Sequence, residues 1–182
     1  MRIIRPAEYR VMPWKNGGGS TTEIYVSPNG TGPFNWRVSI ATVNEDGPFS
    51  AFNGYERHIM VLSGAGMTLD VEGRGRIDLA PLNPFSFSGD LQVASSLSHG
   101  PVLDFNLMVH REFGQGSLYA MDCRAGHELG SGESHHLVYV LQGECGVGNG
   151  QLQPNDSFYL EAGERVFLSR ALKLVICRIT SR

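Results

Sequence analysis

Short apolar segments alternate with turn-forming residues along the whole chain, and this alternation is the main structural signal in the sequence. The segments are rich in Val, Ile, Phe and Tyr, and Gly, Pro, Asn or Asp bounds most of them, which is the pattern of β-strands. No interval carries apolar residues at helical spacing for more than two turns. We therefore predict strands near residues 23–26, 35–43, 56–62, 66–71, 76–79, 85–87, 91–97, 102–110, 117–123, 136–141, 151–153, 157–160, 164–168 and 172–179. Strands this short and numerous indicate an all-β sandwich or barrel.

The sequence also contains an internal repeat. The segment Ile59–Gly64 resembles Val138–Gly143, and Phe85–Asp90 resembles Tyr159–Glu164 further downstream. Two similar segments in the same order predict two related β units within one chain.

Each unit has the order strand, tight Gly turn, strand, strand, and a Gly-acid turn into another strand. This order resembles the cupin superfamily, so we expect an all-β bicupin. Residues 1–112 would form an N-terminal cupin lobe and residues 113–182 a C-terminal one. The connecting stretch, residues 111–116, is too short for a free linker, and the lobes are expected to share an interface.

Composition and charge narrow the class of protein. Of the 182 residues, 41% are hydrophobic and 18% charged, which suits a compact chain, and 23 Gly and 9 Pro disfavour long helices. A net charge of -3 provides no broad basic surface, so neither nucleic acid nor a membrane is expected as a partner. The N-terminal residues lack the apolar core of a signal peptide. The three cysteines are widely spaced without a C-x-x-C motif, so we expect no disulfide framework and a cytoplasmic location.

The histidines do not match the metal site of a catalytic cupin. Such a site resembles H-x-H with a nearby Glu and a more distant His, because a divalent ion needs ligands that converge from adjacent strands. The first unit has Glu56–His58 at this place, where Arg57 would repel a cation. In the second unit the neighbours His135 and His136 would point to opposite faces of a strand, and adding His127 leaves the site incomplete. We therefore expect no metal and no cofactor.

The segment Pro13–Glu23 is the most unusual in the chain. Its three consecutive glycines, Gly17–Gly19, permit backbone conformations and close approaches that other residues forbid. A phosphate-binding loop would have Lys after the last Gly and before a helix. Here Lys15 precedes the glycines and a strand follows, so we reject a nucleotide site. Lys15 and Lys173 are the two lysines of the chain, and Lys15 is interpreted either as a ligand for an anionic or carbonyl group or as a solvated turn residue.

The strand around residue 106 has a polar face. Asp104, Asn106 and Met108 share one face, and Phe105 and Leu107 share the other. If the apolar face packs against a sheet or the other lobe, the polar face lines a cavity that offers an acceptor and an amide. The competing interpretation is a buried polar pair that caps a turn or pairs with an arginine.

Two adjacent charged residues raise a question of orientation. Arg57 could bind a carboxylate with two hydrogen bonds, and Glu56 could neutralise Lys15 or accept from a ligand nitrogen. Because they are consecutive on a strand, one of the two should face inward unless a bulge intervenes, and either could instead form a salt bridge at the barrel mouth. The same question arises on the strand where one face carries Trp36, Val38 and Ile40 and the other carries Arg37, Ser39 and Ala41.

Several ordered motifs between residues 2 and 111 resemble the HutD/Ves family. The motifs are Pro13–Gly19 followed by Glu23-Ile24, Trp36–Ala41, Asp46–Ser50, Gly54–Arg57 and Asp104–Met108. The resemblance implies a bicupin fold, no established catalytic activity and, for the HutD branch, an association with bacterial histidine utilisation. The Ves branch is associated with stress responses, and the segment Lys15–Gly17 is more similar to HutD.

On this resemblance we expect a non-catalytic protein that regulates histidine utilisation by binding a pathway intermediate such as urocanate or formylglutamate. Both are carboxylates, which suits Lys15 and Arg57 for the anion and Asn106 for a polar edge. No catalytic residue is assigned. The candidate ligand-binding residues are Lys15, Asn16, Glu56, Arg57, Asp104 and Asn106.

Other functions stay open at this point. One alternative is a cupin enzyme, either a metal-dependent oxygenase or isomerase, or a metal-free isomerase that uses Glu56, His58 or Asp104 to move a proton. Another is a carbohydrate-binding sandwich, but Trp14 and Trp36 lie in motif segments and not in obvious exposed loops. Exposed strand edges would also allow a homodimer.

Overall fold

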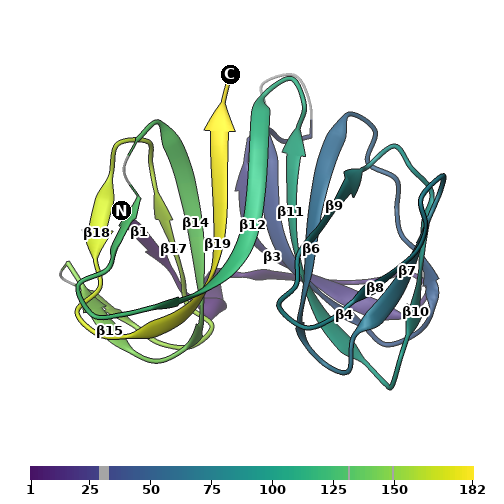
Figure 1. The fold of residues 1–182 in the computed structure, drawn as a ribbon, viewed down its shortest axis with the longest axis horizontal. Coiled ribbons are helices and arrows are strands. Elements are labelled where there is room, and N and C mark those ends of the chain that lie inside the picture. Colours follow the sequence, from purple (N-terminus) through teal and green to yellow (C-terminus); the bar gives the residue numbers. More distant parts are fainter. Residues whose placement is uncertain (29–32, 131, 149) are drawn as a thin grey trace.

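A computed structural model describes residues 1–28, 33–130, 132–148 and 150–182. Two β lobes lie side by side, the N-terminal lobe in blue and teal and the C-terminal lobe in green and yellow (Figure 1). Among the described residues the helical structure consists of a short 3-10 helix, η1 (Pro6–Glu8), and no helix is long and apolar enough to cross a membrane. The prediction of an all-β, two-lobed fold is confirmed.

The strands of the N-terminal lobe are β2 (Arg10–Pro13), β3 (Gly19–Ser27), β4 (Trp36–Val43), β5 (Gly47–Pro48), β6 (Tyr55–Ser63), β7 (Met67–Val71), β8 (Gly75–Leu79), β9 (Phe85–Ser88), β10 (Val93–Leu97) and β11 (Val102–His110). The strands of the C-terminal lobe are β1 (Arg2–Ile4), β12 (Gly114–Cys123), β13 (Glu128–Gly130), β14 (Ser134–Gln142), β15 (Cys145–Val147), β16 (Gly150–Leu152), β17 (Ser157–Leu160), β18 (Arg165–Phe167) and β19 (Leu172–Ser181).

Each strand that the sequence predicts is present, at slightly different bounds. Five further strands, β1, β2, β5, β13 and β15, lie outside the predicted segments, and each has two to four residues. Two to four residues are too few to show an alternation of apolar and polar positions, so the detection of such a strand depends on the residues around it.

Each lobe is built around one large antiparallel sheet. In the N-terminal lobe the order is β2-β3-β4-β11-β6-β9, and a second sheet, β5-β10-β7-β8, covers its inner face. In the C-terminal lobe the order is β1-β17-β14-β19-β12, with two small hairpin sheets beside it. The two large sheets pack against each other through a shared apolar cluster that includes Trp36, Phe105, Leu137 and Val175. The expected interface between the lobes is therefore an apolar core.

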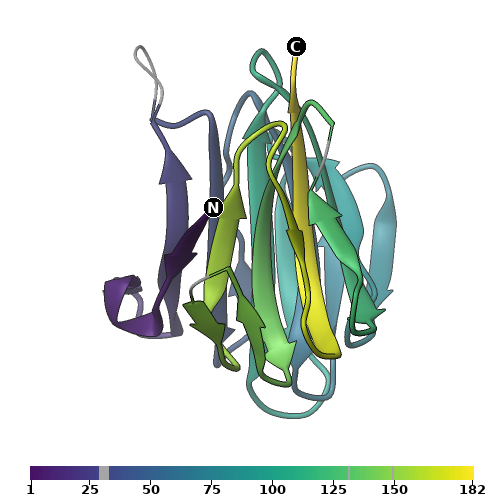
Figure 2. The same cartoon turned by 90° about the vertical axis from the view of Figure 1, so that its left-hand side faces the viewer.

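The first strand of the chain belongs to the sheet of the second lobe. Residues Arg2, Ile3 and Ile4 of β1 pair with Tyr159, Phe158 and Ser157 of β17. Figure 2, which looks onto the C-terminal lobe, shows β1 in dark purple beside β17. The chain therefore starts in one lobe, builds the other, and returns.

The internal repeat is visible in the geometry of two turns. Gly64 follows β6 with φ +105, and Gly143 follows β14 with φ +94. A Cβ on Gly64 would lie 2.8 Å from the carbonyl oxygen of Pro101, and one on Gly143 would lie 2.9 Å from that of Ala171. Both positions therefore require glycine for the same two reasons, a left-handed backbone and a close approach by the following strand.

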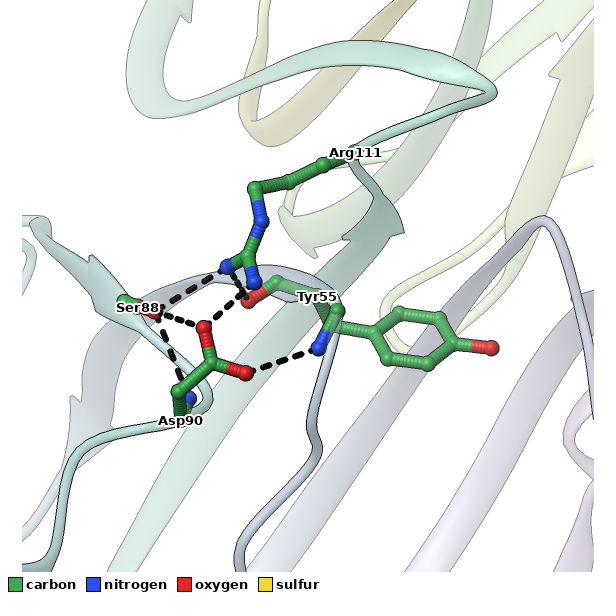
Figure 3. Close-up of polar contacts among 5 residues, drawn as sticks. Tyr55, Ser88, Asp90 and Arg111 are labelled. Carbon is green, nitrogen blue, oxygen red and sulfur yellow. Dashed lines mark hydrogen bonds and ion pairs between the residues drawn. The ribbon is translucent and has the colours of Figure 1, made fainter.

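A polar cluster around Arg111 holds the start of β6. Arg111 follows β11, at the point where the chain passes from the N-terminal lobe to the C-terminal lobe. The Nη1 of Arg111 donates to the carbonyl oxygen of Tyr55 at 3.1 Å and to Ser88 Oγ at 3.0 Å, and its Nη2 contacts the Asp90 carboxylate. The Oδ1 of Asp90 accepts the backbone N–H of Gly54 at 2.8 Å (Figure 3). Since several weak contacts act together, the cluster holds β6 in register with β9.

Candidate functional site

A cavity of about 500 Å³ opens on one side of the N-terminal lobe. Side chains from β3, β4, β6 and β11 and from the segments around residues 15 and 50 surround it. Its lining is Pro13, Trp14, Lys15, Asn16, Thr21, Arg37, Ser39, Ala41, Pro48, Phe49, Ser50, Phe52, Arg57, Asp104, Asn106 and Met108. This volume is typical of small-molecule sites.

The polar face of β11 lies toward this cavity. Asp104, Asn106 and Met108 line it, while Phe105 and Leu107 belong to the apolar cluster between the lobes. The apolar face of β11 therefore packs against the other lobe, and its polar face lines a cavity, which is the first of the two arrangements that the sequence allowed.

Strand pairing arranges the lining in rows. Arg37, Met108 and Arg57 form one row across β4, β11 and β6. The next row places Ser39 beside Asn106, and the one after it places Ala41 beside Asp104. The cavity therefore has two arginines at one end of the sheet surface and a carboxylate at the other.

A chain of hydrogen bonds connects the two ends. The Nη2 of Arg57 donates to Asn106 Oδ1 at 3.1 Å, and Asn106 Nδ2 donates to Asp104 Oδ1. The Nη1 of Arg57 donates to the carbonyl oxygen of Ser50 at 3.2 Å. The exposed fractions of Arg57, Asn106 and Asp104 are 5%, 4% and 1%. Such a buried network holds its members in one geometry.

Burial changes the acid–base properties of both charged residues. It raises the pKa of Asp104 to about 7, against the opposing influence of Arg57 and of the hydrogen bond from Asn106. Burial also lowers the pKa of Arg57 to about 10, and the nearby cation Arg37 acts in the same direction. Arg57 stays charged near neutral pH, whereas Asp104 is close to its titration point.

Aromatic rings surround the two guanidinium groups. The Cζ of Arg57 lies 5.0 Å from the ring centre of Phe87, 5.2 Å from that of Phe49 and 5.5 Å from that of Phe52. The Cζ of Arg37 lies 5.2 Å from the same Phe52 ring. Stacked guanidinium groups are held in place while their N–H edges stay free to donate.

Both arginines have unused donors. The Nε atoms of Arg37 and Arg57 are buried and have no hydrogen-bond partner in the described part of the chain. The Nη2 of Arg37 has a sulfur atom, Met108 Sδ at 3.6 Å, as its partner. Neither guanidinium has a carboxylate within ion-pair distance among the described residues. The site therefore has an excess of donors and positive charge.

The glycine-rich segment forms the turn between β2 and β3, and this turn carries Lys15 and Asn16 to the mouth of the cavity. The backbone N–H of Trp14 donates to the Gly19 carbonyl oxygen at 2.9 Å, which closes the turn. A Cβ on Gly19 would collide with the Thr42 carbonyl oxygen and lie 2.9 Å from the Trp14 ring. Glycine is therefore required here so that the turn can lie against β4.

The structure brings most of the predicted site residues together. Glu56 does not line the cavity, although its neighbour Arg57 does. The two follow the alternation of a regular strand, so one side chain is directed inward and the other is not. Several residues that line the cavity were not among the predicted ligand-binding residues. They are chiefly Arg37, Ser39, Thr21, Trp14, Phe49 and Phe52. The signal for Arg37 was the shared face with Ser39 and Ala41.

The histidines lie outside the cavity. His58 faces Gly116 of β12 in the other lobe. Its Nδ1 lies 2.7 Å from Ser86 Oγ of the neighbouring strand β9, and burial lowers its pKa to about 4. His135 Nδ1 lies 2.7 Å from the hydroxyl of Tyr159. In the described ranges no three or more His, Cys, Asp or Glu side chains gather in a way that could hold a metal.

Fold and site together define a class of protein, a bicupin with a cation-lined cavity in its N-terminal lobe. The HutD family model matches residues 6–176, so the chain belongs to the HutD family. Two solved structures of low identity, the pirin YhhW from Escherichia coli (9% identity, TM-score 0.71) and hazelnut vicilin (11% identity, TM-score 0.67), share the cupin fold alone.

Three relatives are more similar. The solved structure of HutD from Pseudomonas fluorescens SBW25 is 37% identical, with a TM-score of 0.87, and the match covers 100% of this chain and 98% of that one. Protein Ves from Citrobacter koseri is 35% identical over 78% of this chain and 75% of its own length. An uncharacterized 21.2 kDa protein in the hutC 3' region of Pseudomonas putida is 48% identical, but the match spans 59% of this chain and 57% of that protein.

Proposed function

We propose that the N-terminal cavity binds a small organic acid without converting it, and that the bound acid regulates histidine utilisation. Urocanate and formylglutamate, intermediates of that pathway, are the candidate ligands. The family and the relatives named HutD or placed beside hutC support the pathway. We also propose a cytoplasmic location, which the three unpaired, buried cysteines support.

The observation that carries this proposal is the pair of arginines with unused donors. Arg37 and Arg57 lie on one row of the sheet, share the Phe52 ring, and have buried Nε atoms without partners in the described chain. Each guanidinium also has Nη donors, and a carboxylate in the cavity would accept charge-assisted hydrogen bonds from such groups. Two neighbouring cations without a carboxylate partner in the described chain therefore favour an anion here. Lys15 at the mouth adds a further positive charge for an arriving anion.

The test is calorimetric titration of the protein with histidine, urocanate and formylglutamate. We expect saturable heat with at least one of the two acids. The Arg37→Gln and Arg57→Gln variants should each bind about tenfold more weakly or worse, because each loses charge-assisted hydrogen bonds. Arg76→Gln is the matched control, since Arg76 is exposed on β8 and outside the cavity. Absence of heat from every compound at millimolar concentration would overturn the proposal.

One observation favours a second candidate, acid–base catalysis. Asp104 is the carboxylate in the cavity lining, and its pKa of about 7 suits a group that moves a proton near neutral pH. Proton NMR of each acid during incubation with the protein separates the two functions. A binding protein leaves the spectra unchanged, whereas turnover that Asp104→Asn abolishes would establish the enzyme.

A further inference from the structure

The cavity has a cationic end and an acidic end. Arg37 and Arg57 lie on the row of Met108, and Asp104 lies four residues earlier on the same strand, roughly 13 Å of extended backbone. The Arg57 side chain extends toward the acidic end, because its Nη2 reaches Asn106 Oδ1 at 3.1 Å. The amide of Asn106 therefore bridges the guanidinium and the carboxylate.

The acidic end has too few donors for its carboxylate. Asp104 is 1% exposed and, among the described residues, receives a side-chain hydrogen bond from Asn106 alone. Its neighbours across the sheet are Ala41 and Val61, which have no polar side-chain atoms. A buried carboxylate has two oxygens that both accept hydrogen bonds. No oxygen of Asp104 is among the buried atoms that lack a partner in the described structure, so the oxygen that Asn106 leaves free is open to the cavity, where a donor can reach it.

The other charged groups of the lining do not supply it. They are Arg57 from β6, Arg37 from β4 and Lys15 from the turn between β2 and β3. Neither arginine is hydrogen-bonded to Asp104, and Lys15 is exposed at the mouth. Thr21 of β3 accepts from Trp14 Nε1 at 2.8 Å and lies two strands away from Asp104, with Ala41 of β4 between them. The raised pKa of Asp104 is the expected result of a carboxylate with little solvation.

We propose that the ligand of this cavity is a nitrogen-bearing acid, whose carboxylate binds Arg37 and Arg57 and whose N–H group donates to Asp104. This inference rests on the proposed function and makes it more specific, since an acid of equal size without an N–H group would bind poorly. Asp104 is then the residue that determines specificity, and the arginines determine affinity for carboxylates in general.

The test uses two acids that differ at a single ring position, 3-(pyrrol-2-yl)acrylate with an N–H and 3-(furan-2-yl)acrylate with an oxygen. Calorimetry at pH 8 should give at least about tenfold tighter binding of the pyrrole acid, because a hydrogen bond to a charged acceptor is replaced by repulsion between oxygens. Asp104→Asn should reduce this preference to about twofold, since an amide can either donate or accept. Arg37→Gln should weaken both acids equally, and Asp70→Asn, an exposed aspartate on β7, should change neither.

A second measurement needs no variant at position 104. As the pH falls from 8 to 5.5, Asp104 of the free wild-type protein takes up a proton and becomes a donor to the furan oxygen. The preference for the pyrrole acid should then shrink several-fold. Equal affinity of the two acids at both pH values would overturn this inference and leave the proposed function intact. Failure of these and the earlier acids to bind would overturn both.

Discussion

The two lobes use the same strand framework, but their interiors differ at matching positions. The repeat aligns Arg57 with His136, two residues before the similar segments of β6 and β14. In the N-terminal lobe β11 pairs with β6, and Asp104 and Asn106 lie opposite Val61 and Ile59. In the C-terminal lobe β19 pairs with β14, and Leu174 and Ile176 lie opposite the matching residues Val140 and Val138. The inward-facing acid and amide of one lobe are therefore leucine and isoleucine in the other.

This difference accounts for the presence of a cavity in the N-terminal lobe. In the C-terminal lobe Leu174 and Ile176 belong to an apolar cluster inside the lobe. In the N-terminal lobe the apolar cluster that contains Leu69 and Phe87 does not include Asp104 and Asn106, which line the cavity instead. Polar groups that are not fully satisfied lower stability, so the N-terminal lobe gives up stability at the place where a ligand can bind.

The edges of the two sheets also differ. In the N-terminal lobe β3 and β2 continue the sheet beyond β4, and their turn forms one wall of the cavity. In the C-terminal lobe β12 occupies the place of β4 and is the last strand of its sheet. The additional hairpin is therefore a second feature that only the cavity-bearing lobe has.

The largest effect is expected from placing the acid of one lobe in the other. Leu174→Asp would introduce a carboxylate into a fully apolar interior and should lower the free energy of unfolding by at least about 4 kcal/mol. Chemical denaturation measures this loss. Ser181→Asp, at the exposed end of the same strand, is the control and should cost less than about 1 kcal/mol. A Leu174→Asp variant as stable as the control would refute the contrast between the interiors.

A smaller loss is expected from the turn between β2 and β3. Gly19→Ala would force a Cβ against the Thr42 carbonyl oxygen and the Trp14 ring, and should lower the free energy of unfolding by about 2–3 kcal/mol. It should also weaken acid binding, because the turn carries Lys15. The control is Gly47→Ala, since a Cβ at Gly47 meets no atom within 4 Å. Equal melting temperatures for the two variants would contradict the close approach.

Asp104→Asn should raise stability, and the gain should depend on pH. The folded-state pKa of Asp104 is raised above its usual value of 3.8 to about 7. Between these values the folded state holds an additional proton, so this residue lowers stability as the pH rises from about 4 to 7. The variant should therefore exceed the wild type by on the order of 1–2 kcal/mol at pH 8 and by less at pH 5. Denaturation curves at pH 5 and pH 8 measure this gain. The same difference in the free energy of unfolding between variant and wild type at both pH values would disprove the prediction.

The smallest effect is expected at the counterpart of Arg57. His136 is buried with an unpartnered Nδ1 in the described structure, and burial lowers its pKa. His136→Leu should change stability by less than about 1 kcal/mol at pH 7 and leave acid binding unchanged. The wild type should lose stability relative to the variant as the pH falls below 6.5, because unfolding then lets His136 take up a proton. A loss of binding in this variant would show that the second lobe contributes to the site.

Much of the fold follows from local patterns. Strands of four or more residues with an apolar alternation, such as β4 and β11, are evident in the sequence, and so is the repeat of β6 and β14. Strand β1 is not, because three residues form a strand only when β17 offers its edge. That partner lies at the other end of the chain, so no window of sequence around residue 3 contains the information.

Part of the candidate site was predictable because it also follows from local alternation along a strand. The alternation of β11 places Asp104 and Asn106 on one face whatever surrounds them, because successive side chains of a strand point to opposite faces. The alternation of β6 could not decide between Glu56 and Arg57, since the strand lies inside the sheet and both of its faces are largely buried. Arg37 also shares a face with Ser39, but its meeting with Arg57 depends on β11 lying between them.

The order of residues along this chain was enough to predict most of its strands, its duplication and its family, because each of these depends on the local spacing of residues. Which strand faces enclose an open space, and which charged groups meet there, depended on the packing of segments distant in the chain. A face of a strand becomes a cavity wall only when the opposite sheet leaves it uncovered, and residues far away in the sequence control that covering.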